Sequence, residues 1–254
     1  MQTAAGALLA RAIGVAMAAP KTPGPDYSAV LAKGVRGAVA KAVPALDGER
    51  LGDLMTELFG VADSAFASVV AKDPPRRTIA CKAGCAYCCH LYVQVTPLEA
   101  IHLARALRAR GAEALAAVQG RVAAAHRKTA GKDAEYRNFL AVPCPLLRDG
   151  QCSVYEERAF GCRGANSADA DACRRGMGNS SSVPLPTFVH QRNIYAAVGN
   201  GAAHGLLDAG ARPNVLELIA ALHLALAHED PLRAWQSGEI DFEPARCREA
   251  GKRV

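Results

Sequence analysis

Four cysteines lie within nine positions in the stretch CKAGCAYCCH, residues 81–90. Thiolates are soft ligands, and at this density they suit zinc, an iron–sulfur cluster or Cu(I). Cys85 and Cys88 have the spacing at which a zinc knuckle brings two sulfurs to one ion, and Gly84 offers the backbone freedom that such a turn needs. The side chains of adjacent residues point apart, so Cys88 and Cys89 suit two different ions, or one bridging position, better than a shared ion.

A second group of cysteines follows a long intervening stretch of helical pattern. Eight cysteines would satisfy two tetrahedral sites, and fewer would suffice if a thiolate bridged two ions. The ninth, Cys247, stands alone near the end of the sequence and is expected to be a buried small residue, as free cysteines often are. The predicted metal ligands are Cys81, Cys85, Cys88, Cys89, Cys144, Cys152, Cys162 and Cys173.

Disulfides explain these cysteines less well than metal binding does. The chain has 254 residues, half of them apolar, so it can bury a substantial core, whereas disulfide frameworks are typical of short secreted chains. The opening MQTAAGALLARAIGVAMAAP imitates a signal peptide, but no basic residue precedes its apolar part and Arg11 interrupts it. No stretch approaches the length that spans a bilayer. We therefore expect reduced thiols in a cytoplasmic protein without membrane attachment.

Two other classes of function are disfavoured by the sequence. Cys81, Cys85 and Cys88 also match the three-cysteine pattern of radical S-adenosylmethionine enzymes, but that chemistry belongs on repeated strand–helix units, and helical patterns flank these cysteines on both sides. The formal charge of +6 is shared among 30 basic and 24 acidic residues, without an aromatic-interleaved basic patch, so nucleic acid is not expected as a partner. The sequence has no nucleophile–base pair, phosphate loop or dinucleotide fingerprint.

Helical periodicity dominates the rest of the chain and predicts a mostly α fold, with helices packed around an irregular cysteine-rich metal-binding centre. The sharpest start signal is Thr96 as N-cap, with Pro97 at the first position and Glu99 completing a capping box. We expect a disordered or helical lead over 1–25, N-terminal helices over 26–72, a cysteine-cluster domain over 73–175 and a helical extension over 187–254 on the same core. Helices are predicted over 27–43, 51–72, 97–111, 112–130, 187–210 and 214–228, with the linker GMGNSSSVPLP before the last two.

The stretches CKAGCAYCCHLYVQVTPLEA and CPLLRDGQCSVYEERAFGCRG together resemble the bacterial YkgJ-type cysteine-cluster family, to which zinc or iron chelation is ascribed. The likeness covers residues 81–163 and departs from the family pattern at Ala159, where proline is usual. It implies that cysteine thiolates bind one or more zinc or iron ions, and it does not imply a reaction. The alternative is an iron–sulfur or S-adenosylmethionine-dependent methyl-transfer enzyme, because the cysteine motif also resembles that of flagellin lysine methylases.

Four further residues could support such a centre. Arg158 and Arg163 flank the last cysteine of the motif, where guanidinium groups would offset the negative charge of several thiolates. Tyr155 is a candidate hydroxyl donor, with a packed aromatic as its alternative. His90 is read as a polar residue that leaves the loop rather than as a ligand.

Overall fold

A computed structural model gives the fold for residues 27–82, 84–178, 183–212 and 214–247. It is mostly helical, as the sequence predicts, and the strands among these residues are two short antiparallel pairs. The predicted lead over 1–25 lies outside the described residues, and so does part of the predicted linker. Within the described ranges, no helix is both long enough and apolar enough to cross a membrane.

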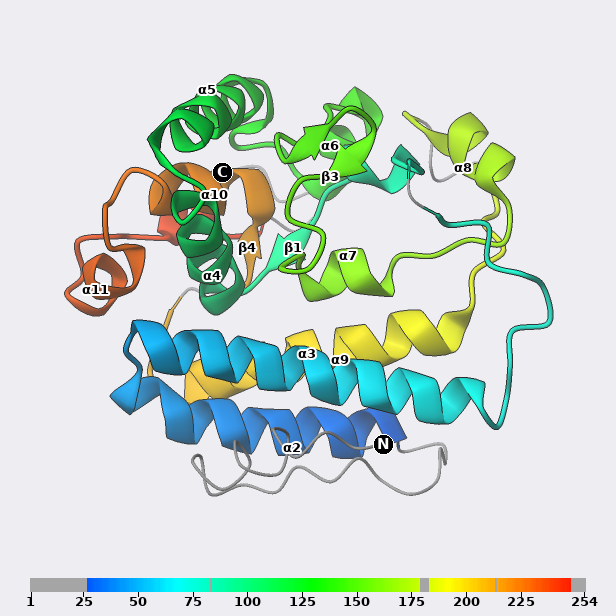
Figure 1. Cartoon of the computed structure of the whole chain (residues 1–254), viewed down its shortest axis with the longest axis horizontal. Helices are drawn as coiled ribbons and strands as arrows, with labels where there is room; N and C mark the ends of the chain where they lie inside the picture. Colours follow the sequence, from blue (N-terminus) through cyan, green and yellow to red (C-terminus); the bar gives the residue numbers. More distant parts are fainter. Residues whose placement is uncertain (1–26, 83, 179–182, 213, 248–254) are drawn as a thin grey trace.

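Three long helices form one layer of the molecule, drawn at the bottom of Figure 1. These are α2 (Tyr27–Ala42), α3 (Gly48–Val70) and α9 (Val189–Asp208). Helices α2 and α9 approach each other closely because glycines face α2: a Cβ on Gly201 would lie 2.6 Å from the carbonyl oxygen of Ala32. The glycines of α9 therefore set the spacing of this layer.

A second group of helices packs above one end of this layer (Figure 1). Its first helix begins with the predicted capping box: the side chain of Thr96 accepts from Glu99 N, and Glu99 Oε2 accepts from Thr96 N at 2.7 Å. A short pair of strands, β1 and β4, links this helix to the C-terminal part of the chain. The elements are β1 (Gln94–Val95), α4 (Pro97–Arg108), α5 (Ala112–Thr129), β4 (Leu216–Glu217), α10 (Leu218–Ala225) and α11 (Pro231–Gln236).

The cysteine-bearing segments lie above the other end of the layer, around α6 to α8 in Figure 1. They are short, and no periodic pattern predicted α6, α8 or the β2–β3 hairpin. The segment around Val154 is a series of turns, and the helix α7 begins at Phe160. The elements are η2 (Tyr87–His90), α6 (Ala134–Leu140), β2 (Leu147–Arg148), β3 (Gln151–Cys152), α7 (Phe160–Gly164) and α8 (Ala170–Gly176).

One hydrophobic cluster connects all of these parts. It contains buried side chains from the helical layer, from the α4–α10 group and from the segments around α7, such as Leu58, Leu103 and Phe160. Cys144, Cys152 and Cys162 pack against it from the side. Described residues of the three predicted segments, within 27–72, 73–175 and 187–247, thus contribute to the same core. Two short 3-10 turns complete the fold, η1 (Val43–Ala45) and η4 (Glu243–Ala245).

Candidate metal centre

The N-terminal cysteine motif forms a tight turn that leads into η2. Gly84 has the positive φ of 85° that its position before Cys85 suggested. The backbone N–H of Cys85 donates to Lys82 O at 3.0 Å, and that of Cys89 donates to Ala86 O at 3.0 Å. These local bonds fix Cys85, Cys88 and Cys89 on consecutive turns of one compact loop.

Cys81 lies on an extended segment beside Ser167, a residue that the sequence did not single out. Ala80 N donates to Ser167 O at 2.8 Å, and Ser167 N donates to the sulfur of Cys81 at 3.3 Å. Burial raises the pKa of the Cys81 thiol, the Ser167 contact opposes the shift, and interactions with three other cysteines add to it. Those three are Cys85, Cys88 and Cys173.

Cys173 belongs to this group through the position of α8. Asp169 caps the N-terminus of α8, where its side chain accepts from Ala172 N at 2.9 Å, and the helix packs against η2. This contact brings Cys173 near Cys81 although their positions in the sequence are far apart. Cys173 is among the ligands that the sequence predicts, and the fold places it with the N-terminal cysteines.

The backbone joins the second cysteine group directly to the first. Cys144 N donates to Cys89 O at 2.7 Å, which holds the start of the second motif against η2. Cys152 follows on the β2–β3 hairpin, where Leu147 pairs with it across a two-residue turn. That turn is Asp149-Gly150, and both residues have the positive φ that a type I′ hairpin turn requires.

Cys162 lies on α7, and a buried carboxylate positions this helix. Glu99 is 3% exposed, and besides capping α4 its Oε1 accepts the N–H of Phe160 at 2.9 Å. The capping residue found in the sequence therefore also links α4 to the first residue of α7. Burial raises the pKa of the Cys162 thiol, and its interactions with Cys144, Cys88 and Cys152 act in the same direction.

Eight cysteines are therefore connected by electrostatic interactions into two groups that meet at η2. Burial raises the pKa of Cys144 to about 11 in this environment, with Cys152 adding to the shift. A hydrogen bond with Cys89 is the main cause that raises the pKa of Cys88, followed by burial. All nine cysteines are free thiols. In the described part of the chain, however, no three His, Cys, Asp or Glu side chains are arranged as they stand to hold a metal ion.

The two arginines that the sequence singled out have different surroundings. The guanidinium of Arg158 stacks on the ring of Tyr155 at 3.6 Å and interacts electrostatically with Cys88 and Cys152. The guanidinium of Arg163 lies over the ring of Phe59 at 3.9 Å and donates from Nε to Arg158 O at 3.0 Å. Arg158 is thus the one placed to offset thiolate charge, while Arg163 holds α7 on the core.

Arg137, on α6, was missed by the sequence analysis. It is 1% exposed, and its guanidinium donates to His90 O at 3.1 Å and to Val142 O at 3.0 Å. It therefore clamps the end of η2 to the segment that leads into Cys144, and it interacts electrostatically with that cysteine and with Glu217. Nothing in the short stretch AEYRNFL distinguishes a buried arginine from an exposed one, because the burial comes entirely from tertiary packing.

The remaining candidates lie at the edge of the centre or outside it. A ring nitrogen of His90, Nδ1, is 3.1 Å from Ala86 O, so this histidine is tied to its own loop. Tyr155 is 56% exposed and serves as the stacking surface for Arg158. Cys247 lies beside the β1–β4 pair, where its N–H donates to Val215 O at 3.1 Å and its thiol interacts with Tyr92 and Gln94.

Comparison with known proteins gives no further identification. The chain matches no family model, and no curated protein and no solved structure matches it. The resemblance to the YkgJ-type family is therefore carried by the motif residues alone.

Proposed function

We propose that this protein is a metal-chelating protein that binds zinc or iron through cysteine thiolates, and that it holds more than one ion. The observation that carries the proposal is the connection of eight cysteines, from η2, the β2–β3 hairpin, α7, α8 and the adjoining loops, into two groups that meet at Cys88 and Cys89. A structural zinc site needs four ligands, so eight neighbouring thiols favour two ions or bridging thiolates.

The two groups suggest how the ligands divide. The first set consists of Cys81, Cys85, Cys88 and Cys173, and the second of Cys89, Cys144, Cys152 and Cys162. Because no three ligand-type side chains converge in the described residues, binding includes a reorientation of cysteine side chains toward each ion. Arg158 and the buried Arg137 would offset the negative charge that such thiolate sites carry.

Zinc is our preferred ion. Helices surround the cysteines, and we find no strand scaffold of the kind on which cluster-dependent radical enzymes are built among residues 27–82, 84–178, 183–212 and 214–247. Free thiols in this number suit a reducing compartment, so we place the protein in the cytoplasm, and the family resemblance suggests a bacterial one. An iron–sulfur centre with methyl-transfer activity is the outcome that would replace the zinc assignment.

The test is elemental analysis and X-ray absorption on protein purified without oxygen. We expect zinc bound through sulfur with a second metal nearby, whereas a brown protein would indicate an iron–sulfur centre. Cys88→Ser should reduce the metal content, and Cys247→Ser is the matched control, because it removes a partly buried thiol outside the eight. Fully stable metal-free protein, or equal metal content in the two variants, would contradict the proposal.

A further inference from the structure

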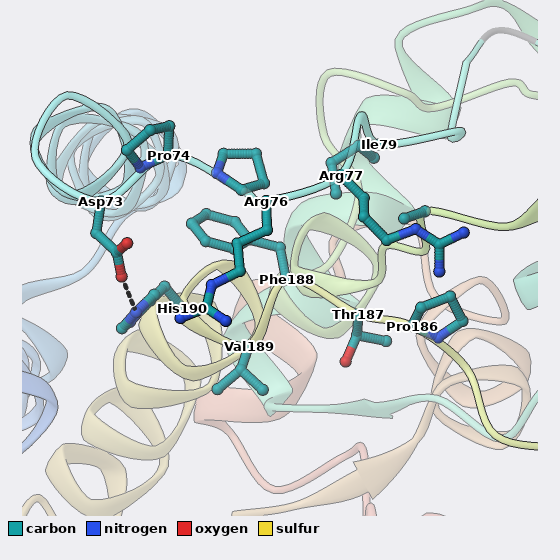
Figure 2. Close-up of a pocket in the computed structure, with 12 residues that line it drawn as sticks. Asp73, Pro74, Arg76, Arg77, Ile79, Pro186, Thr187, Phe188, Val189 and His190 are labelled. Carbon is teal, nitrogen blue, oxygen red and sulfur yellow. Dashed lines mark hydrogen bonds and ion pairs between the residues drawn. The ribbon is translucent and has the colours of Figure 1, made fainter.

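A cavity of about 300 Å³ lies outside the proposed metal centre, between the loop that follows α3 and the start of α9. Figure 2 shows its walls: prolines on the loop side, and Phe188 with Thr187 on the opposite side. The imidazole of His190 joins the two sides through a contact of 3.0 Å with the carboxylate of Asp73. A volume of this size is at the small end of the range for sites of small organic ligands.

Two arginines give the cavity its charge. In Figure 2 the guanidinium of Arg76 lies below the ring of Phe188 and toward His190, and that of Arg77 lies farther to the right, toward Pro186. Neither has a hydrogen bond or an ion pair with another residue of the described chain, although both line the cavity. The carboxylate of Asp73 is engaged by His190, so the two arginines leave the lining with an excess of positive charge that suits an anion.

The start of α9 strengthens this preference. The helix has 20 residues, no side chain caps its N-terminus, and no acidic residue occupies its first turn. Its free N–H groups and the positive end of its dipole favour an anion at this position. The cavity therefore combines two guanidinium groups that have no partner among the described residues with a helix end that no side chain caps.

The rest of the lining is apolar and flat. Pro74, Pro75 and Pro186 form stiff walls, and the ring of Phe188 provides an aromatic surface beside Arg76. Phe188 is held in place by contacts with Phe66, at 6.1 Å between ring centroids, and with His190, at 5.4 Å. A planar apolar body can stack on such a ring while its anionic group meets a guanidinium.

We propose that this cavity binds a small aromatic anion, with the ring on Phe188 and a carboxylate or phosphate held by Arg76 or Arg77 and the start of α9. The site is independent of the proposed metal centre, although the two are neighbours. Ile79 of the cavity wall is two residues from Cys81, and Ala168 directly follows Ser167, which bonds the sulfur of Cys81.

The test uses saturation-transfer NMR on the full-length protein with phenyl phosphate and benzoate as probes, and inorganic phosphate as competitor. Displacement by inorganic phosphate would show that the anion alone suffices, and a stronger response to phenyl phosphate than to benzoate would assign the phosphate class. Benzyl alcohol, which keeps the ring without the charge, should bind at least fivefold more weakly. At least one of the variants Arg76→Gln and Arg77→Gln should weaken phenyl phosphate binding by about tenfold or more, which corresponds to the loss of one charged hydrogen bond.

The matched control is Arg127→Gln, which removes an exposed arginine from α5, far from the cavity. It should leave phenyl phosphate binding unchanged, and melting curves should confirm that all three variants fold. Binding that is equal in the wild type and in both cavity variants would overturn the proposal, as would equal binding of benzyl alcohol. Because none of these measurements depends on the metal content, failure here leaves the proposed metal centre untouched, and the reverse also holds.

Discussion

Replacing Arg137 by methionine should destabilise the protein and loosen the cysteine centre together. Methionine is unbranched and apolar, so it can fill much of the space that the arginine side chain occupies, but it cannot donate hydrogen bonds. The change leaves the carbonyl oxygens of His90 and Val142 without the donor that now satisfies them, at 3.1 and 3.0 Å. One of these oxygens ends η2, and the other precedes Cys144 by two residues.

The magnitude follows from those two bonds. A hydrogen bond from a charged group contributes about 1.5–3 kcal/mol, so losing both costs roughly 3–6 kcal/mol. Part of this is offset because the variant no longer buries a charge, and the Nε of Arg137 has no partner as it stands. We therefore expect a loss of about 3 kcal/mol in the free energy of unfolding, which in a chain of this size lowers the melting temperature by roughly 6–12 °C.

The assay is guanidinium unfolding and calorimetric melting of the variant, together with its metal content. Arg137→Lys should give an intermediate loss, because one ammonium group does not reproduce the planar fork that reaches both carbonyls. Arg127→Met, at an exposed position on α5, should change the free energy of unfolding by less than about 0.5 kcal/mol. If Arg137→Met melted within a degree or two of the wild type with its metal content unchanged, Arg137 would not be the clamp that the geometry indicates.

Three further predictions concern packing, pH and metal removal. Gly201→Ala should lower the free energy of unfolding by about 1–3 kcal/mol, because its Cβ would lie 2.6 Å from Ala32 O and 2.8 Å from the Cβ of Val35. Gly34→Ala, where a Cβ would meet open space, should instead raise it by about 0.5–1 kcal/mol; chemical unfolding measures both. Burial, with a smaller effect of His223, lowers the pKa of His126 in the fold, so the unfolded chain binds more protons than the folded one. The free energy of unfolding should therefore fall as pH drops below about 6.5, by at most about 1.4 kcal/mol per pH unit. His126→Gln should flatten this slope in melts from pH 7 to 5. Treatment with a strong chelator should lower the melting temperature by several degrees, and an unchanged melt would count against a contribution of metal to folding.

The sequence predicted the helices well, because their signals are local. Periodic apolar residues and the capping box at Thr96 and Glu99 mark α4 within a few residues, and the same is true of α2, α3, α5 and α9. The short elements α6, α8 and the β2–β3 hairpin carry too few residues for a period to emerge. Their Asp133, Asp169 and Asp149-Gly150 signals are visible only once the elements are known.

The grouping of the cysteines was only partly predictable, and the reason is physical. Spacing within a motif shows which thiols are neighbours along the chain, as with Cys85 and Cys88. Whether Cys173 lies near Cys81 depends on the packing of α8 against η2 and on the backbone contact of Ser167. Contacts of this kind join positions more than eighty residues apart and leave no periodic signal, as the separation of 86 residues between Cys81 and Ser167 illustrates.

The contacts that hold the centre are polar and irregular, in contrast to the helical layer beneath it. Asn138 accepts the N–H of Tyr92 at 2.6 Å, Arg137 holds the carbonyl of His90, and Ser167 holds the sulfur of Cys81. Each such contact contributes about 1 kcal/mol or a little more, whereas α2, α3 and α9 are stabilised by a continuous apolar interface. Local opening should therefore be easier around η2, α6 and α8 than in the long helices. The candidate ligands lie in this part of the fold, so an ion bound there as proposed would add most to its stability.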